Sequence, residues 1–156
     1  MGALPTHPIL CLFPPFHCFF GIIALMKTVA LRLNPQQDLK VELEAFVEKH
    51  NVEAACIVTC VGSLTQATLR LANQPEGKVY KGRFEVVSLT GTLSRHGCHC
   101  HMAIADSTGY TIGGHLLKGC LIFTTAELII GILPNLRFTR EFDETTGFSE
   151  LKIETL

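Results

Sequence analysis

The chain has 156 residues, of which 47% are hydrophobic and 17% are charged, and its formal net charge is −1. This length fits one domain with a buried core, and the apolar composition argues against intrinsic disorder over most of the chain. A DNA-binding domain usually shows a basic excess or a basic stripe. Because the sequence shows neither, its charge balance gives no support to nucleic-acid binding.

Residues 1–25 contain four prolines and no Lys, Arg, Asp or Glu. A transmembrane helix needs about 20 uninterrupted apolar residues, and a signal peptide needs a positive region before its apolar core. The prolines interrupt the apolar run, so a transmembrane helix does not fit. A signal peptide does not fit either, because the first positive residue, Lys27, follows the apolar run. We therefore expect residues 1–25 to be a disordered or non-native extension ahead of Met26, and we expect no membrane association.

The next part of the chain predicts a strand followed by a helix. Residues 27–33 alternate between apolar and polar side chains, which is typical of a strand. Asp38 is placed to cap a helix over about residues 38–50, where apolar residues recur at helical spacing.

Beyond the helix, β-type patterns alternate with turn signals. The apolar run Glu53–Val61 predicts a buried strand that ends at Gly62, and the capping-box spacing of Ser63 and Gln66 predicts a short helical turn. Residues 73–82 are polar and predict a turn region. Further strands are expected over residues 67–71, 84–93, 98–106, 110–112, 121–133 and 137–142.

One main helix and several short strands predict an α+β fold with a central, largely antiparallel sheet. We expect this domain to span residues 26–151, followed by a C-terminal tail of residues 152–156.

The densest chemistry of the sequence is a set of histidines. His99 and His101 share one face of a strand because side chains alternate along it. A turn signal at Ser107–Gly109 would return the chain so that His115 lies near His101. Three imidazoles with an open fourth position are the pattern of a zinc site that keeps water or substrate bound. The alternative is a group of surface or partner-facing histidines that bind no metal.

Gly113 and Gly114 precede the third histidine and leave room for a ligand or a neighbouring chain. The seven cysteines are odd in number and lie mostly among apolar neighbours, so we interpret them as reduced and buried in a cytoplasmic protein. Metal ligation by Cys98 and Cys100 is less favoured. A nucleophilic Cys–His pair is also disfavoured, because strand alternation places both thiols on the opposite face from His99.

Glu127 lies inside an apolar strand pattern and is expected to be buried. A buried carboxylate needs a partner, and we favour an ion pair with Arg83 or Arg137 over an acid–base role beside the histidines. Arg70 and Arg83 are also candidates for contacts between subunits.

Several motifs occur together in the order and spacing of a known family. They are GRFEVVSLTGTLS (Gly82–Ser94), the H-x-H of His99–His101, IGGHL (Ile112–Leu116) and TTAE (Thr124–Glu127). With these motifs the chain resembles the plant and prokaryote conserved (PPC) domain family, over about Lys27 to Leu151.

The resemblance implies an α+β fold assembled as a homotrimer, with metal-binding members that use the histidines matching His99, His101 and His115. In plant members the domain mediates protein contacts and follows an AT-hook, a basic R-G-R-P element that enters the DNA minor groove; this sequence contains no such element. Two functions stay open. One is a trimeric regulatory or interaction module, DNA-associated by analogy with the family. The other is a zinc-binding protein or metal-dependent enzyme for an unknown small molecule, with no catalytic residue indicated.

Overall fold

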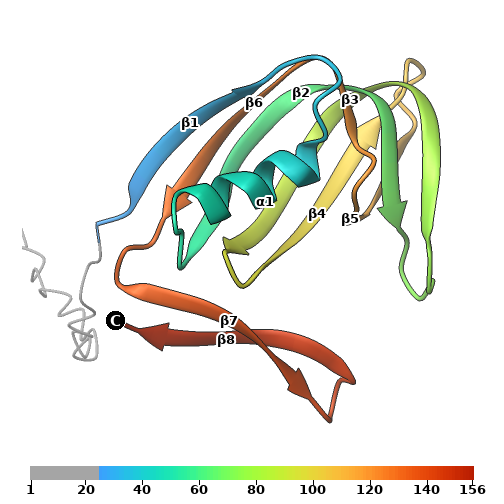
Figure 1. Ribbon diagram of the computed structural model, residues 1–156. Coiled ribbons are helices and arrows are strands. Elements are labelled where there is room, and N and C mark those ends of the chain that lie inside the picture. Colours follow the sequence, from blue (N-terminus) through green and yellow to red (C-terminus); the bar gives the residue numbers. More distant parts are fainter. Residues whose placement is uncertain (1–24) are drawn as a thin grey trace, which may run out of the picture.

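The computed structural model describes residues 25–156 (Figure 1). Its elements are one helix, α1 (Leu39–Lys49), and the strands β1 (Lys27–Leu33), β2 (Ala55–Arg70), β3 (Gly77–Ser94), β4 (Gly97–Ala105), β5 (Thr111–Leu116), β6 (Leu121–Ile132), β7 (Leu136–Asp143) and β8 (Phe148–Thr155).

Six strands form one antiparallel sheet in the order β1-β6-β2-β3-β4-β5, and β7 and β8 form a separate two-stranded sheet. The end of β2 also pairs with β5, with Leu69 opposite Leu116 and Arg70 opposite His115. The six-stranded sheet therefore curls until its last strand meets a central one (Figure 1). The predicted α+β fold with an antiparallel sheet and one main helix is confirmed.

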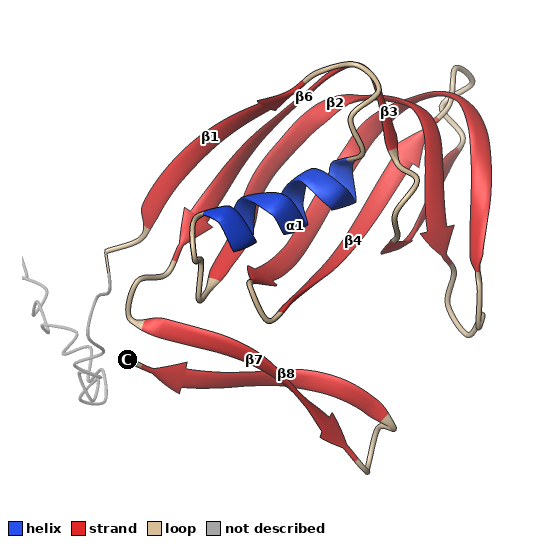
Figure 2. Cartoon of the chain, in the orientation of Figure 1, coloured by secondary structure: helices blue, strands red, loops and turns tan. Residues whose placement is uncertain are grey.

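Helix α1 lies across one face of the curved sheet (Figure 2). Leu39, Leu43 and Val47 recur on the buried side of the helix and join a single core with residues of the sheet such as Leu93 and Ile130. Asp38 caps the helix as predicted: its carboxylate accepts the backbone N–H groups of the second and third residues that follow, at 2.9 and 3.3 Å.

The helical turn predicted at Ser63–Gln66 is wrong, because β2 continues through it from Ala55 to Arg70. Gly62 does not end the strand. It allows β2 to pair closely with β6, because a Cβ at this position would collide with the carbonyl oxygen of Thr125 on β6. The strand is paired on both sides, and its register shifts near Leu64, so a β-bulge stands where a helical turn was expected. Among residues 25–156, α1 is the only helix.

The two-stranded sheet of β7 and β8, called the C-terminal hairpin below, lies beside the larger sheet (Figure 1). Phe138 is buried, its backbone N–H donates to the carbonyl of Glu53 at 2.9 Å, and Arg137 Nε lies 2.9 Å from the same residue's carboxylate. Most of the predicted tail, residues 152–156, belongs to β8.

The expectation for the N-terminal extension falls on residues 1–24, which lie outside the described residues, and on Leu25. Within residues 25–156, no helix has the length and apolar character needed to cross a membrane.

Glu127 is exposed, which corrects the prediction that it is buried in an ion pair. Its neighbours on β6, Ala126 and Leu128, face the core, so strand alternation turns the carboxylate to the outer face of the sheet. The arginines considered as partners have other contacts. Arg83 lies 4.6 Å from the centroid of the Phe123 ring, and Arg137 pairs with Glu53.

Candidate metal centre

Strand β4 presents two histidines on one face and buries the residues between and after them. Cys100 and Met102 are 1% and 2% exposed and belong to the core, whereas His99 and His101 are exposed on the opposite face. The alternation of apolar and imidazole side chains therefore sets which way the strand faces.

A tight turn brings the third histidine to this face. Asp106 accepts the backbone N–H groups of Thr108 and Tyr110 at 2.8 and 3.1 Å, which fixes the turn between β4 and β5. The antiparallel register then places His115 directly opposite His101. The prediction that the turn unites these two histidines is confirmed, and Asp106 is held in the turn, away from them.

The three imidazoles are close enough to share one ion. The Nε2 atoms of His99 and His101 are 3.2 Å apart, and one ring nitrogen of each histidine, His115 included, lies within 4.8 Å of the others. Nitrogens at zinc's usual bond length, arranged tetrahedrally, are about 3.3 Å apart. The Nε2 atoms of His99 and His101 already have this spacing, and the ring nitrogen of His115 needs only a small shift to reach it.

His115 has a ring nitrogen that needs a partner. Its Nδ1 atom is buried and makes no hydrogen bond within the described part of the chain, and such an atom is costly unless water or a metal satisfies it. Burial, with smaller effects from His99 and Arg70, lowers the pKa of His115 to about 4. Burial also lowers the pKa of His99, and the nearby His101 and Arg140 lower it further. Neutral imidazoles are the form that binds metal.

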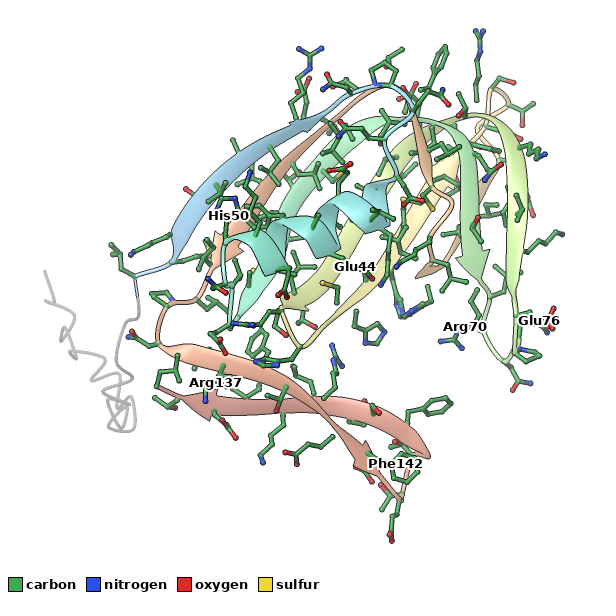
Figure 3. The ribbon with its side chains drawn as sticks, in the orientation of Figure 1. Glu44, His50, Arg70, Glu76, Arg137 and Phe142 are labelled. Carbon is green, nitrogen blue, oxygen red and sulfur yellow. The ribbon has the colours of Figure 1, made fainter. Side chains whose placement is uncertain are left out.

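The histidines line a pocket of about 470 Å³ between the large sheet and the C-terminal hairpin. Arg70 contributes from the end of β2 (Figure 3), and Arg140, Phe148 and Glu150 contribute from the hairpin. Arg140 Nη2 donates to Thr92 Oγ1 on β3 at 2.9 Å. Sequence reasoning did not assign Arg70, Arg140 or Glu150 to the site, because their approach depends on pairings between segments far apart in the chain.

The two glycines before His115 approach different strands, Gly113 approaching β4 and Gly114 approaching β2. A Cβ on Gly114 would lie 2.7 Å from the carbonyl oxygen of Arg70, so this glycine permits the close pairing of β5 with β2. Both glycines line a second pocket of about 430 Å³ that shares Arg70, His101 and His115 with the first. The expected room beside the histidines is therefore present.

The cysteines of β4 do not belong to the cluster. Burial raises the pKa of Cys100 to about 12 and also raises that of Cys98. Both thiols thus stay protonated at neutral pH and are poor nucleophiles. Among residues 25–156, the metal-competent group consists of the three histidines alone.

The model of the Plants and Prokaryotes Conserved (PCC) domain matches residues 23–134. The chain belongs to this family. The match confirms the resemblance seen in the sequence and covers all three histidines, while the C-terminal hairpin lies beyond it.

One curated relative matches most of this chain over a small part of its own length. A bifunctional protein GlmU of Synechococcus is 47% identical over 129 residues, which cover 83% of this chain and 21% of that protein. The chain thus spans about a fifth of this curated relative's length.

Two solved structures share the fold at higher coverage. A hypothetical protein from Salmonella enterica superposes with a TM-score of 0.83 at 43% identity, covering 85% of this chain and 96% of that one. A metal-containing protein from Archaeoglobus fulgidus superposes with a TM-score of 0.69 at 28% identity, covering 81% and 93%.

Proposed function

We propose that this chain is a metal-binding member of the PCC family, and that His99, His101 and His115 hold a zinc ion. The observation that carries the proposal is the convergence of three imidazoles, two of them with ring nitrogens 3.2 Å apart. The unpartnered Nδ1 of His115 supports it, as does the similarity to an archaeal protein described as metal-containing. Zinc is preferred because imidazole ligands suit it and its site tolerates three protein ligands.

The residues of the chain would have two different roles at this centre. The histidines supply three neutral nitrogen ligands from two paired strands, and the C-terminal hairpin supplies the opposite wall of the pocket. When bound with an open position, zinc polarises a bound oxygen atom or lowers the pKa of a bound water. This is the form in which the protein would act as a metal-dependent enzyme on a small molecule.

Metal analysis of the purified protein tests the proposal. After removal of metal and reconstitution with zinc, we expect one zinc ion per chain in the wild type, and none at the same free zinc concentration in His99→Ala and His115→Ala. His96→Ala is the matched control, because His96 is an exposed histidine whose ring lies 3.3 Å from Glu53 and outside the cluster. Wild-type protein without stoichiometric zinc would refute the metal centre.

A second candidate function is a regulatory or interaction module that assembles as a homotrimer. It is favoured by a groove on the outer face of the sheet, where apolar side chains such as Val61 and Ile129 lie among a few polar ones, which are Arg32, Thr59 and Glu127. Val61 is 56% exposed, and contiguous exposed apolar surface is typical of contacts between proteins. Light scattering during gel filtration should give the mass of three chains, and Val61→Lys should lower it. A monomeric wild type would end this candidate.

DNA association rests on family analogy alone, because the net charge of −1 offers little attraction to phosphates. A mobility-shift titration with duplex DNA at low salt tests it. Failure to shift the duplex at low salt, where electrostatic binding is strongest, would exclude direct DNA binding.

We also propose a cytoplasmic location, since the cysteines of the described residues are all free and none forms a disulfide.

A further inference from the structure

Two arginines that line the histidine pocket have no acidic partner. In the described residues, no carboxylate lies within 4.0 Å of the guanidinium of Arg70 or Arg140, whereas Arg95 and Arg137 pair with glutamates. Arginine side chains that are neither paired nor fully solvated are suited to bind an anion. The lack of a carboxylate partner at these two guanidinium groups therefore favours a role in ligand binding over a structural ion pair.

The two arginines flank the metal-binding histidines from different sheets. Arg70 is the register partner of His115 across β2 and β5. Arg140 reaches from the C-terminal hairpin to Thr92, which is the register partner of His99. One guanidinium thus stands beside each end of the histidine cluster, and both line the same pocket.

The charge of the pocket favours a negatively charged occupant. Glu150 is the only carboxylate among its lining residues, against two arginines. A divalent ion on the histidines would add two further positive charges. The volume of about 470 Å³ is in the range of small-molecule sites, so the pocket has room for a small anion.

We propose that the pocket binds a small molecule through its carboxylate or phosphate group, with Arg70 and Arg140 holding the anion beside the open position of the metal. This inference rests on the proposed metal centre and names the class of ligand that it serves. Guanidinium groups match the planar, two-oxygen edge of carboxylate and phosphate. An oxygen of the same molecule would face the metal.

Calorimetric titration of zinc-loaded and zinc-free protein tests the proposal with three probes. Lactate represents a carboxylate, methyl phosphate represents a phosphate, and propane-1,2-diol is the neutral counterpart of lactate. We expect the zinc-loaded wild type to bind one or both anions and not the diol. The anion that binds more tightly identifies the chemical source of the group.

The variants Arg70→Gln and Arg140→Gln should each weaken anion binding by about tenfold or more, because each removes a charge-assisted hydrogen bond. Arg83→Gln is the control, since Arg83 lies on the Phe123 ring and does not line the pocket. Zinc stoichiometry of each variant shows that the fold and the metal centre are intact.

The outcomes separate this inference from the metal proposal. Normal zinc binding without anion binding, or with equal anion binding in all variants, would overturn the ligand class and leave the metal centre standing. A second outcome is that the protein fails to bind zinc but still binds an anion, and that this binding depends on the two arginines. This outcome would support the arginine pair and refute the metal centre. Equal binding of lactate and the diol would contradict recognition of charge.

Discussion

His101 of β4 and His115 of β5 are register partners on adjacent antiparallel strands, and their ring centroids lie 5.6 Å apart. The tight turn held by Asp106 produces this pairing. The third imidazole, His99, belongs to the same face of β4. The cluster therefore depends on one hairpin, and the native register of this hairpin is a condition for binding one ion with all three rings.

Zinc should raise the melting temperature of the wild type and leave that of His101→Ala unchanged. A ligand that binds only the folded state adds about 2.7 kcal/mol of stability at a free concentration of 100 times its Kd. His101 is exposed, so the substitution itself should change the free energy of unfolding by less than about 0.5 kcal/mol. Thermal unfolding with zinc and then with excess chelator measures the effect. An equal zinc-dependent increase in His101→Ala would contradict the assignment.

The histidine pairing could be predicted from the sequence because its causes are local. Alternation along β4 sets the face of His99 and His101, and a short turn sets the register with His115. Arg70 and Arg140 could not be assigned to the site in this way. Their positions depend on the closure of β5 against β2 and on the placement of the C-terminal hairpin, for which no short-range pattern exists.

The errors also have physical causes. An apolar run such as β6 predicts burial on both faces of a strand. In the described residues only the face with Ala126 and Leu128 is covered, so Glu127 is exposed. At Ser63–Gln66 a capping pattern was outweighed by backbone pairing to two neighbouring strands, since tertiary pairing overrides local propensity.

Asp38→Ala should lower the free energy of unfolding by about 1–2 kcal/mol, the usual cost of losing an N-cap. The upper end is expected because the second carboxylate oxygen also accepts the backbone N–H of Gly119. Urea unfolding followed by circular dichroism measures the change. Asp38→Asn is the matched variant: it keeps an acceptor and should retain most of the stability. Equal losses in the two variants would show that the cap is not the cause.

Gly114→Ala should destabilise the protein more than Gly113→Ala does. The added methyl group at residue 114 would lie 2.7 Å from a backbone oxygen of β2, whereas at residue 113 the nearest atom, a backbone oxygen of β4, is 3.3 Å away. Forcing atoms into a packed region costs about 1–3 kcal/mol. Urea unfolding of both variants tests this order, and a reversed order would show that β5 is not closely packed against β2.

The ion pair of Glu53 with Arg137 should make stability depend on pH in the acid range. The hydrogen bond from Arg137, with a smaller contribution from His96, lowers the pKa of Glu53 below its ordinary value of about 4.5. The folded state then binds fewer protons than the unfolded state, so this contribution is present above pH 4.5 and is lost as the pH falls through the lower folded-state pKa.

Glu53→Gln should therefore be less stable than the wild type at pH 7, with a difference that shrinks below pH 4.5. Denaturant unfolding of both proteins at several pH values between 7 and 3 measures it. Glu141→Gln is the control, because Glu141 pairs with Lys152 within the C-terminal hairpin and away from Glu53. A constant difference across this range would contradict the role of the Glu53 charge.

The C-terminal hairpin is a sheet of its own, so the pocket wall that it supplies is separable from the rest of the fold. Its contacts to the rest of the domain include the buried Phe138, the Arg137–Glu53 pair and the Arg140–Thr92 hydrogen bond. Local opening of such a unit costs less than global unfolding. Amide hydrogens of β7 and β8 should thus exchange with solvent faster than those of β2 and β6. A molecule that bridges Arg70 and Arg140 would slow this exchange by tying the hairpin to the sheet.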